Sequence, residues 1–245
     1  IGFEPRLQGL PRAVDEGLYG RQRALQHLGD VLVTHLLALP QQECRALVLG
    51  QHSDGLGHFR LQLPAQQGVR RDGFTFVFGL GGIHGSVESE IIESTDDDII
   101  VDLDVTSYYP NLAITNGFYP AHLGKTFVTI YKHLFEQRKQ YPKKSAESAM
   151  LKLALNGVYG DSNNQFSVFY DPLFTMSITL NGQLLLCLLA EGLMHIEGLR
   201  LIQVNTDGLT VRVPRANKWL VDMARAAWQT RTGLNLEEAV YKRVF

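Results

Sequence analysis

Hydrophobic positions along the chain follow two repeats, one typical of strands and one typical of helices. Short apolar runs that predict strands lie at 74–78, 99–105, 201–204, 209–213 and 234–245. Apolar positions spaced three to four residues apart, which predict helices, extend over 21–39, 126–138, 145–159, 171–196 and 214–227. Pro142 separates the second of these helices from the third, so we expect a short antiparallel helical hairpin there. Residues 50–73 show no clear period and are expected to be a connector.

Two carboxylates interrupt the strand predicted at 99–105. Asp102 and Asp104 are two residues apart, so both side chains should leave the same face of the strand. Burying an uncompensated carboxylate costs on the order of several kcal/mol, unless a cation or a hydrogen-bond donor offsets it. Pro110 lies shortly after the strand and favours its end. Asp104 is therefore either a metal ligand or a capping or turn residue, and the strand alone leaves both interpretations open.

A further aspartate lies in a predicted hairpin turn. The runs at 201–204 and 209–213 flank the segment Asn205-Thr206-Asp207-Gly208, and Asp-Gly is a strong turn dipeptide. Turns favour aspartate without any catalysis, so the hairpin by itself fully accounts for Asp207.

Polar side chains share one face of the helix predicted at 145–159. Lys152, Asn156 and Tyr159 are spaced i, i+4 and i+7. They form either a ligand-binding face or an ordinary solvated face. In the second case the apolar residues of the helix supply its buried side, namely Met150, Leu151, Leu153, Ala154 and Leu155.

Glycines are dense after the first predicted strand. Gly79, Gly81, Gly82 and Gly85 surround His84, and glycine permits close approach of the backbone to a ligand. A tight turn between two strands and a contact with a nucleic-acid backbone explain this segment equally well.

Composition narrows the class of protein only modestly. The chain has 245 residues, with 45% hydrophobic and 20% charged residues, which allows one large domain or two small ones. Cys44 and Cys187 are far apart and suggest a reduced, cytosolic setting. We find no signal peptide, no apolar run long enough for a bilayer and no histidine spacing typical of zinc. The net charge of −2 argues mildly against nucleic acid. However, a basic segment (125–152) follows an acidic one (88–104), which suits a site for metal cations and a polyphosphate.

Taken in order, these segments resemble the core motifs of family B DNA polymerases. Asp104 to Pro110 resembles motif A, Asp-x-x-Ser-Leu-Tyr-Pro, and 152–160 resembles motif B, Lys-x-x-x-Asn-Ser-x-Tyr-Gly. Residues 178–183 resemble an Ile-Thr-x-x-Gly-Arg element, 205–208 resemble motif C, and 78–82 resemble a Tyr-x-Gly-Gly template loop. The resemblance covers residues 74–245 and is greatest to the phage-encoded branch.

The chain departs from the family pattern at several places. Asn205 replaces the first acid of motif C, while Asp207 occupies the slot of the metal-binding acid. The intervals between motifs are short, which argues against a terminal-protein primer. Upstream, Asp30 and Thr34 faintly resemble a third exonuclease motif, but the first two are absent, so we predict no proofreading. Both ends look like cuts, and the chain is expected to be a fragment.

The resemblance implies an α+β fold, a polymerase palm with an antiparallel sheet backed by helices and a two-helix fingers hairpin. Residues 1–70 would be the tail of an exonuclease-like domain and a linker, and 126–160 the fingers. Residues 71–125 and 161–245 would form the palm, and a thumb would lie beyond the chain. Implied partners are primer-template DNA and dNTPs, with no membrane, for a monomer in the cytoplasm of a bacterial host.

The resemblance also implies a role for individual residues. Two Mg²⁺ ions, or Mn²⁺, would be held by Asp104, the Val105 carbonyl and Asp207, with the two aspartates catalytic. The dNTP would contact Arg138, Lys152, Asn156, Tyr109, Tyr159 and Ser107, with Lys143 or Lys144 in addition. Template and primer would contact Gly81, Gly82, His84 and Thr206. The alternatives are a metal-dependent nuclease built on the same carboxylates and a non-catalytic nucleic-acid-binding remnant.

Overall fold

The computed structural model describes residues 67–245, which belong to one compact unit of the chain, Arg60–Phe245. The predicted helix at 21–39, the exonuclease-like segment around Asp30 and most of the predicted connector lie outside the described residues.

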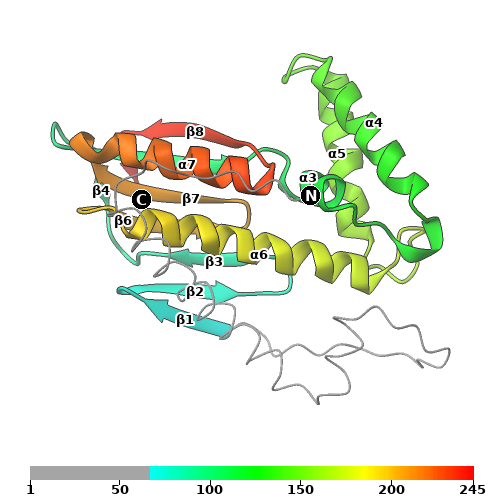
Figure 1. The fold of residues 1–245 in the computed structure, drawn as a ribbon, viewed down its shortest axis with the longest axis horizontal. Coiled ribbons are helices and arrows are strands. Elements are labelled where there is room, and N and C mark those ends of the chain that lie inside the picture. The colour runs from blue at the N-terminus through cyan, green and yellow to red at the C-terminus, as the bar shows by residue number, and fades with distance from the viewer. Residues whose placement is uncertain (1–66) are drawn as a thin grey trace, which may run out of the picture. The chain divides into compact units, whose positions relative to one another are not determined.

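A seven-stranded antiparallel sheet forms the centre of this unit, with strand order β1-β2-β3-β6-β7-β5-β8 (Figure 1). Its strands are β1 (Gln67–Arg71), β2 (Phe74–Phe78), β3 (Ile83–Ser86), β5 (Asp98–Val105), β6 (Arg200–Asn205), β7 (Gly208–Pro214) and β8 (Leu236–Tyr241). The short strands β4 (Ile92–Glu93) and β9 (Arg243–Val244) pair with each other separately. Strand β5 lies one strand in from the β8 edge, and its pairing with both β7 and β8 fixes the positions of its two aspartates.

Within residues 67–245, five α-helices accompany the sheet: α3 (Tyr108–Asn116), α4 (Thr126–Lys139), α5 (Ala146–Asp161), α6 (Pro172–Met194) and α7 (Lys218–Thr232). Short 3₁₀ turns occupy Ala121–Leu123 and Arg215–Asn217. Helices α6 and α7 cover one face of the sheet, whereas α4 and α5 form a hairpin that projects from one end (Figure 1). The α+β fold with a helix-backed antiparallel sheet, predicted from the sequence, is confirmed.

Local sequence explains where the hairpin and α6 begin. The Ser145 hydroxyl accepts a hydrogen bond from the Ser148 N–H at 3.1 Å, which caps α5. The Asp171 carboxylate accepts one from the Phe174 N–H at 3.0 Å, and Pro172 occupies the first position of α6, where its fixed φ suits a helix start. In the hairpin, the buried Tyr131 hydroxyl donates to the Leu155 carbonyl at 2.5 Å and ties α4 to α5.

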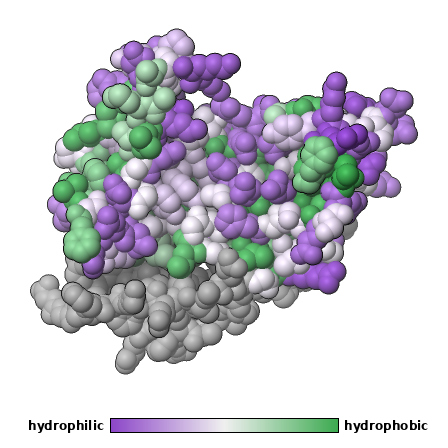
Figure 2. Space-filling model, turned by 180° about the vertical axis from the view of Figure 1, so that it is seen from behind, coloured by the Kyte–Doolittle hydropathy of each residue, from purple (hydrophilic) through white to green (hydrophobic). Residues whose placement is uncertain are grey.

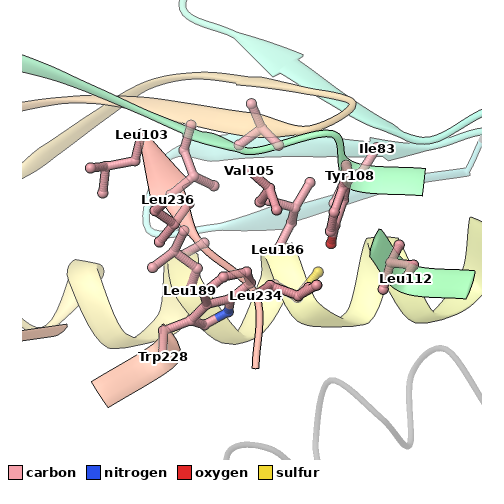
Figure 3. Packing of buried hydrophobic residues seen from close by; sticks show 14 of the residues in the cluster. Ile83, Leu103, Val105, Tyr108, Leu112, Leu186, Leu189, Trp228, Leu234 and Leu236 are labelled. Atoms are coloured by element: carbon pink, nitrogen blue, oxygen red, sulfur yellow. The ribbon is translucent and has the colours of Figure 1, made fainter. Parts of the chain in front are cut away.

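The main core lies between the sheet and the two covering helices. Leu103 and Val105 of β5 point toward Leu186 and Leu189 of α6, with Trp228 of α7 beside them (Figure 3). Fully burying a side chain of this size contributes about 1.5–3 kcal/mol. The Trp228 indole N–H donates to the Leu185 carbonyl at 2.8 Å, so its polar atom is satisfied as well.

From Ile100 onward, the other face of β5 becomes steadily more exposed along the strand. Ile100 is fully buried with Ile92 and Ile202 next to the β4–β9 pair, Asp102 is half-buried, and Asp104 is exposed. The period-two alternation thus places both aspartates on the face that α6 and α7 do not cover, as the sequence predicts. Figure 2 views the molecule from that side, where hydrophilic and weakly hydrophobic residues intermingle.

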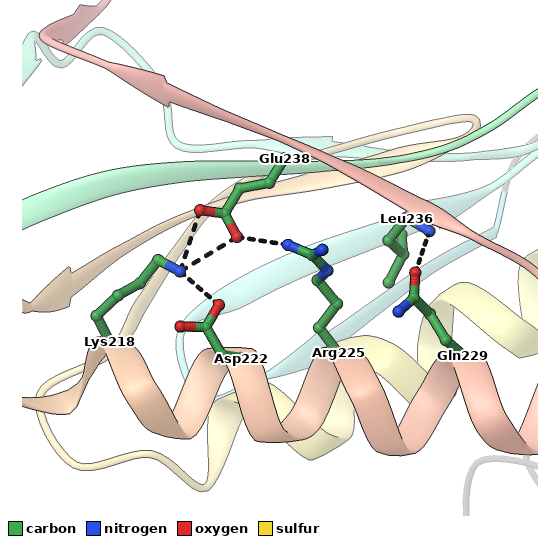
Figure 4. A network of polar contacts seen from close by, with 6 residues as sticks. All are labelled: Lys218, Asp222, Arg225, Gln229, Leu236 and Glu238. Atoms are coloured by element: carbon green, nitrogen blue, oxygen red, sulfur yellow. Dashed lines mark hydrogen bonds and ion pairs between the residues drawn. The ribbon is translucent and has the colours of Figure 1, made fainter.

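Strand β8 is tied to α7 through its inward-facing side (Figure 4). The Glu238 carboxylate accepts hydrogen bonds from Lys218 at 3.1 Å and from Arg225 at 2.9 Å. The Gln229 side-chain carbonyl accepts from the Leu236 N–H at 2.7 Å. These contacts leave Glu237, the neighbour of Glu238, on the opposite face of the sheet.

Three predictions about local structure are wrong. The end of the predicted connector is strand β1, and the predicted strand 234–245 is interrupted at Lys242 into β8 and β9, which belong to different sheets. The apolar side of α5 is not buried: Met150 and Leu153 are 72% and 74% exposed, and Leu155 is buried. Helix α5 is one arm of a projecting hairpin, so neighbours cover only a narrow stripe of it.

The long helix α6 has two further properties. By length and composition alone it could cross a membrane, contrary to the sequence-based expectation, but 56% of its apolar window is buried within the protein. A core helix passes the same test, so this is weak evidence for a membrane span. Burial of Cys187, a free cysteine on this helix, raises the pKa of its thiol to about 12.

Candidate active site

Asp104 and Asp207, far apart in the sequence, are brought together by the pairing of β5 with β7. Asp104 lies opposite Gly208, the first residue of β7, and Asp207 directly precedes that residue. The Val105 N–H donates to the Asp207 carbonyl at 2.8 Å and fixes the turn against the end of β5. The two predicted catalytic carboxylates therefore lie at adjacent positions of one sheet edge.

Gly208 provides the space that the Asp104 carboxylate occupies. A Cβ atom at position 208 would collide with Asp104 Oδ1 and would lie 2.7 Å from the Leu103 carbonyl oxygen. The turn itself takes its positive φ at Thr206, at 55°, whereas Gly208 does not adopt a positive φ. The sequence reading of Asp-Gly as the turn dipeptide is thus wrong in detail: the glycine makes room for a carboxylate.

The environment of Asp104 disfavours its negative charge. Partial burial is the largest cause, and the charges of Asp102, Asp207 and Glu237 add to it, so the pKa of Asp104 rises from 3.8 to about 6. A carboxylate surrounded by like charges is stabilised by a bound cation.

The pKa of Asp207 is also raised, mainly by burial and further by the charge of Asp102. Two effects oppose this rise: a backbone hydrogen bond and the positive charge of Lys152 on α5. The charge of Lys152 therefore acts on Asp207, although Lys152 is exposed on the hairpin.

Two more acids border this pair. Asp102 accepts hydrogen bonds from the Thr210 hydroxyl at 2.6 Å and from the Tyr241 hydroxyl at 3.2 Å, so its carboxylate is already engaged. Glu237 of β8 lies opposite Asp104 and accepts from Lys143, in the loop between α4 and α5, at 2.9 Å. Glu237 was missed in the sequence, although its alternation with the buried Leu236 could have placed it on the open face.

A guanidinium from the hairpin reaches the end of β5. Arg138 on α4 donates to the Ser107 hydroxyl at 2.8 Å, and Ser107 adopts a left-handed conformation with φ of 47°. The Nε of Arg138 is buried and has no hydrogen-bond partner among residues 67–245. Arg138 thus keeps an N–H donor that an anionic ligand could use.

Two tyrosines join the β5 end to the hairpin. The rings of Tyr109 and Tyr159 stack with centroids 4.0 Å apart, and the Tyr159 hydroxyl hydrogen-bonds the Thr179 hydroxyl on α6 at 2.7 Å. Burial raises the pKa of Tyr109, so it is a neutral hydroxyl at physiological pH. Its hydroxyl donates to the Gly81 carbonyl of the β2–β3 connection.

The glycine segment forms a β2–β3 connection that packs on the aspartate turn. A Cβ at Gly82 would lie 3.1 Å from Thr206 Cγ2 and 3.3 Å from the Tyr109 hydroxyl, tighter than ordinary contact. The Thr206 N–H donates to the Ile83 carbonyl at 2.8 Å, and His84 pairs with Asn205 across β3 and β6. Gly81, Gly82, His84 and Thr206, predicted to bind DNA, therefore form one contiguous region beside Asp207.

Asn156 is the least connected of the predicted residues. It is exposed on α5, and within the described part of the chain no hydrogen bond joins it to the other site residues.

The donor set at the paired aspartates fits a hard divalent cation. It offers carboxylate oxygens from Asp104 and Asp207 in a negatively charged setting, and oxygen donors of this kind suit Mg²⁺ and Mn²⁺. Among residues 67–245, no group of three or more histidine, cysteine or acidic side chains is arranged to hold a metal ion.

No protein-family model and no curated protein matches the chain. Among solved structures, the chain is similar to the family B DNA polymerase from the hyperthermophilic archaeon Pyrobaculum calidifontis, with 19% identity and a TM-score of 0.45. The match covers 73% of this chain and 27% of that one, so the chain spans about a quarter of that polymerase. A likeness at this level does not assign a function.

Proposed function

We propose that the chain is the catalytic core of a template-directed DNA polymerase, which transfers a nucleotide from a dNTP to the 3′-hydroxyl of a primer. One observation carries the proposal. Four segments that are distant in the sequence converge on Asp104 and Asp207: the end of β5, the β6–β7 turn, the α4–α5 hairpin and the glycine connection. A nuclease built on the two carboxylates would not need the cationic hairpin above them.

The metal-binding part of the proposal rests on charge and on donor chemistry. Asp104 and Asp207 would hold two Mg²⁺ ions, with the Val105 carbonyl as a further oxygen ligand. Mg²⁺ bound there would neutralise the charge that develops on the phosphates during transfer. The raised pKa values of both aspartates fit this role, because a bound cation would remove the repulsion that raises them.

The hairpin would supply the nucleotide site. Arg138 has a free buried N–H, and the charge of Lys152 reaches Asp207, so both would bind the triphosphate. Ser107, which accepts from Arg138, would orient that guanidinium. Lys143, which donates to Glu237 in this structure, would release Glu237 and donate to a phosphate oxygen of the dNTP.

The tyrosines would shape the pocket for the sugar and the base. Tyr109, held between Tyr159 and the glycine connection, would lie under the incoming sugar and reject a 2′-hydroxyl. Tyr159 and Asn156 would border the nascent base pair. Gly81, Gly82, His84 and Thr206 would follow the DNA backbone, mostly through phosphate and sugar contacts.

Primer extension tests the proposal directly. The purified chain is incubated with a labelled primer-template, four dNTPs and Mg²⁺, beside Asp207→Asn as a matched control. We expect the primer to grow with the wild type, and we expect Asp207→Asn to retain its fold and its DNA binding but to lose incorporation. Shortening of the primer would instead identify a nuclease, and binding without any reaction would identify a non-catalytic remnant.

The motif resemblance supports finer statements within this proposal. It favours family B and its phage-encoded branch, with α4 and α5 as fingers and the sheet as palm. We infer a monomer that acts on DNA in the cytoplasm of a bacterial host.

A further inference from the structure

A glutamine on α6 binds the glycine connection from below. The Gln183 side-chain Nε2 donates to the Gly79 carbonyl at 2.6 Å and to the Gly82 carbonyl at 2.9 Å. Gln183 is 4% exposed, so these bonds form away from water. Both acceptors are carbonyl oxygens and only an amide NH₂ can donate to both, so this pairing also determines which way the Gln183 amide is turned.

A third carbonyl of the turn, that of Gly81, is bound by a residue of the candidate site. Tyr109 donates to the Gly81 carbonyl, and the Gly79 N–H donates to the Gly82 carbonyl at 2.9 Å within the segment. Carbonyls 79, 81 and 82 are therefore all drawn toward the protein by defined donors. Gly82 packs tightly on Thr206 and Tyr109, so a shift of this segment would disturb the candidate active site.

The outer side of the segment faces open space. Leu80 is 58% exposed, and a Cβ added at Gly81 would meet no atom within 4 Å. A trans peptide places its N–H opposite its carbonyl. Drawing the Gly79 carbonyl inward therefore turns the Leu80 N–H outward, where it could donate to a phosphate oxygen of DNA.

We propose that Gln183 is a positioning residue for DNA binding: it holds residues 79–82 so that the outward Leu80 N–H receives a backbone phosphate and Tyr109 stays in place. This inference rests on the proposed function for the identity of the ligand. Its structural part, that Gln183 sets the conformation of residues 79–82, stands on the two hydrogen bonds alone.

Three variants test this role. Gln183→Met keeps the length of the side chain and removes both donors, whereas Gln183→Arg restores N–H donors in a longer side chain. Gln140→Met makes the same chemical change at an exposed position at the end of α4 and serves as the control. Each variant is measured by amide hydrogen exchange, by binding to primer-template over a salt series, and by steady-state extension.

For Gln183→Met we expect faster exchange confined to the amides of residues 79–83. Since a hydrogen bond contributes about 1 kcal/mol net, the loss of two should weaken DNA binding by up to about thirtyfold, because the DNA must then order residues 79–82 itself. The salt slope should fall by about one, as for one lost phosphate contact. The kcat at saturating DNA should change less than the KM for DNA. Gln183→Arg should recover most of the affinity, and Gln140→Met should match the wild type.

Wild-type exchange and wild-type affinity in Gln183→Met would overturn the proposal. So would a general loss of protection along α6 with a matching fall in Tm, because that would show a purely structural role. If the wild type does not extend primers but the local exchange response to Gln183→Met is present, the proposed function fails and the positioning role survives. The two failures are therefore distinguishable.

Discussion

The carboxylate of Asp104 occupies the space in which a side chain at Gly208 would lie. The two residues face each other across the β5–β7 ladder, and a Cβ at position 208 would collide with Asp104 Oδ1. Gly208 is thus part of the carboxylate site as well as of the turn region, so a substitution at this position should affect activity.

Gly208→Ala should therefore displace the Asp104 side chain and reduce primer extension by about a hundredfold or more, if positioning of the carboxylate is needed. The clash with the Leu103 carbonyl should also lower the free energy of unfolding by about 1–3 kcal/mol. Gly192→Ala is the control, because a Cβ there meets nothing within 4 Å and alanine favours a helix interior. Activity equal to wild type in Gly208→Ala would show that the site tolerates the movement of Asp104.

Neutralising Asp104 should stabilise the metal-free protein at neutral pH. The pKa of Asp104 is raised from 3.8 to about 6, so ionisation of this group opposes folding. The raised pKa favours the folded state below about pH 4, and that contribution is lost as the pH rises through about 6. With EDTA present, Asp104→Asn should melt about 2–4 °C above the wild type at about pH 7.5, after allowing for solvent screening. The two proteins should melt together near about pH 4, and a difference that is the same at both pH values would contradict the assignment.

Arg138→Lys should raise the KM for dNTP by about tenfold, because lysine keeps the charge but loses the planar fork that reaches Ser107 and a phosphate together. Arg138→Ala should raise the KM further. Lys139→Ala is the matched control, since Lys139 is exposed and its partners are Glu136, in an ion pair, and the ring of Phe135, both on α4 itself. A KM for dNTP that moves equally in the Lys139 and Arg138 variants would point to general electrostatics and not to a specific contact.

Tyr109→Ala should loosen discrimination against ribonucleotides by about tenfold or more, since it removes the ring under the sugar. Tyr109→Phe keeps the ring stacked on Tyr159 but loses the hydrogen bond to Gly81, so it should keep most of the discrimination. The measured quantity is the ratio of kcat/KM for dNTP and rNTP. An unchanged ratio in Tyr109→Ala would show that Tyr109 does not reject the 2′-hydroxyl of a ribonucleotide.

The spacing of apolar residues predicts where the helices and strands of this chain lie better than it predicts which of their side chains are buried. The strands at 74–78 and 99–105 and the helices at 126–138 and 171–196 are confirmed, because each repeat is local. The same local pattern misassigns the buried side of α5, since Met150 and Leu153 have no neighbour to cover them. In α7, Trp219 and Met223 follow a helical repeat but are exposed, and Val221 and Trp228 are buried instead.

The candidate site depends on contacts that no local pattern encodes. Asp104 and Asp207 could be paired from the sequence only through a resemblance, because the β5–β7 register is a long-range property. The link from Gln183 to the glycines could not be predicted: the resemblance of residues 178–183 to a family element marks the position but does not indicate its partner. Glu237, by contrast, could have been placed on the open face of the sheet from the sequence, because it follows the buried Leu236 in a predicted strand.

The adjacent residues Glu237 and Glu238 of β8 point to opposite faces of the sheet, and contacts with α7 determine which of them faces Asp104. Glu238 is clamped by Lys218 and Arg225 behind the sheet, so Glu237 alone faces Asp104. A one-residue slip of a strand exchanges its two faces. Helix α7 therefore fixes the alignment of β8: a one-residue slip would turn Glu238 toward Asp104 in place of Glu237 and would move Leu236 out of the core.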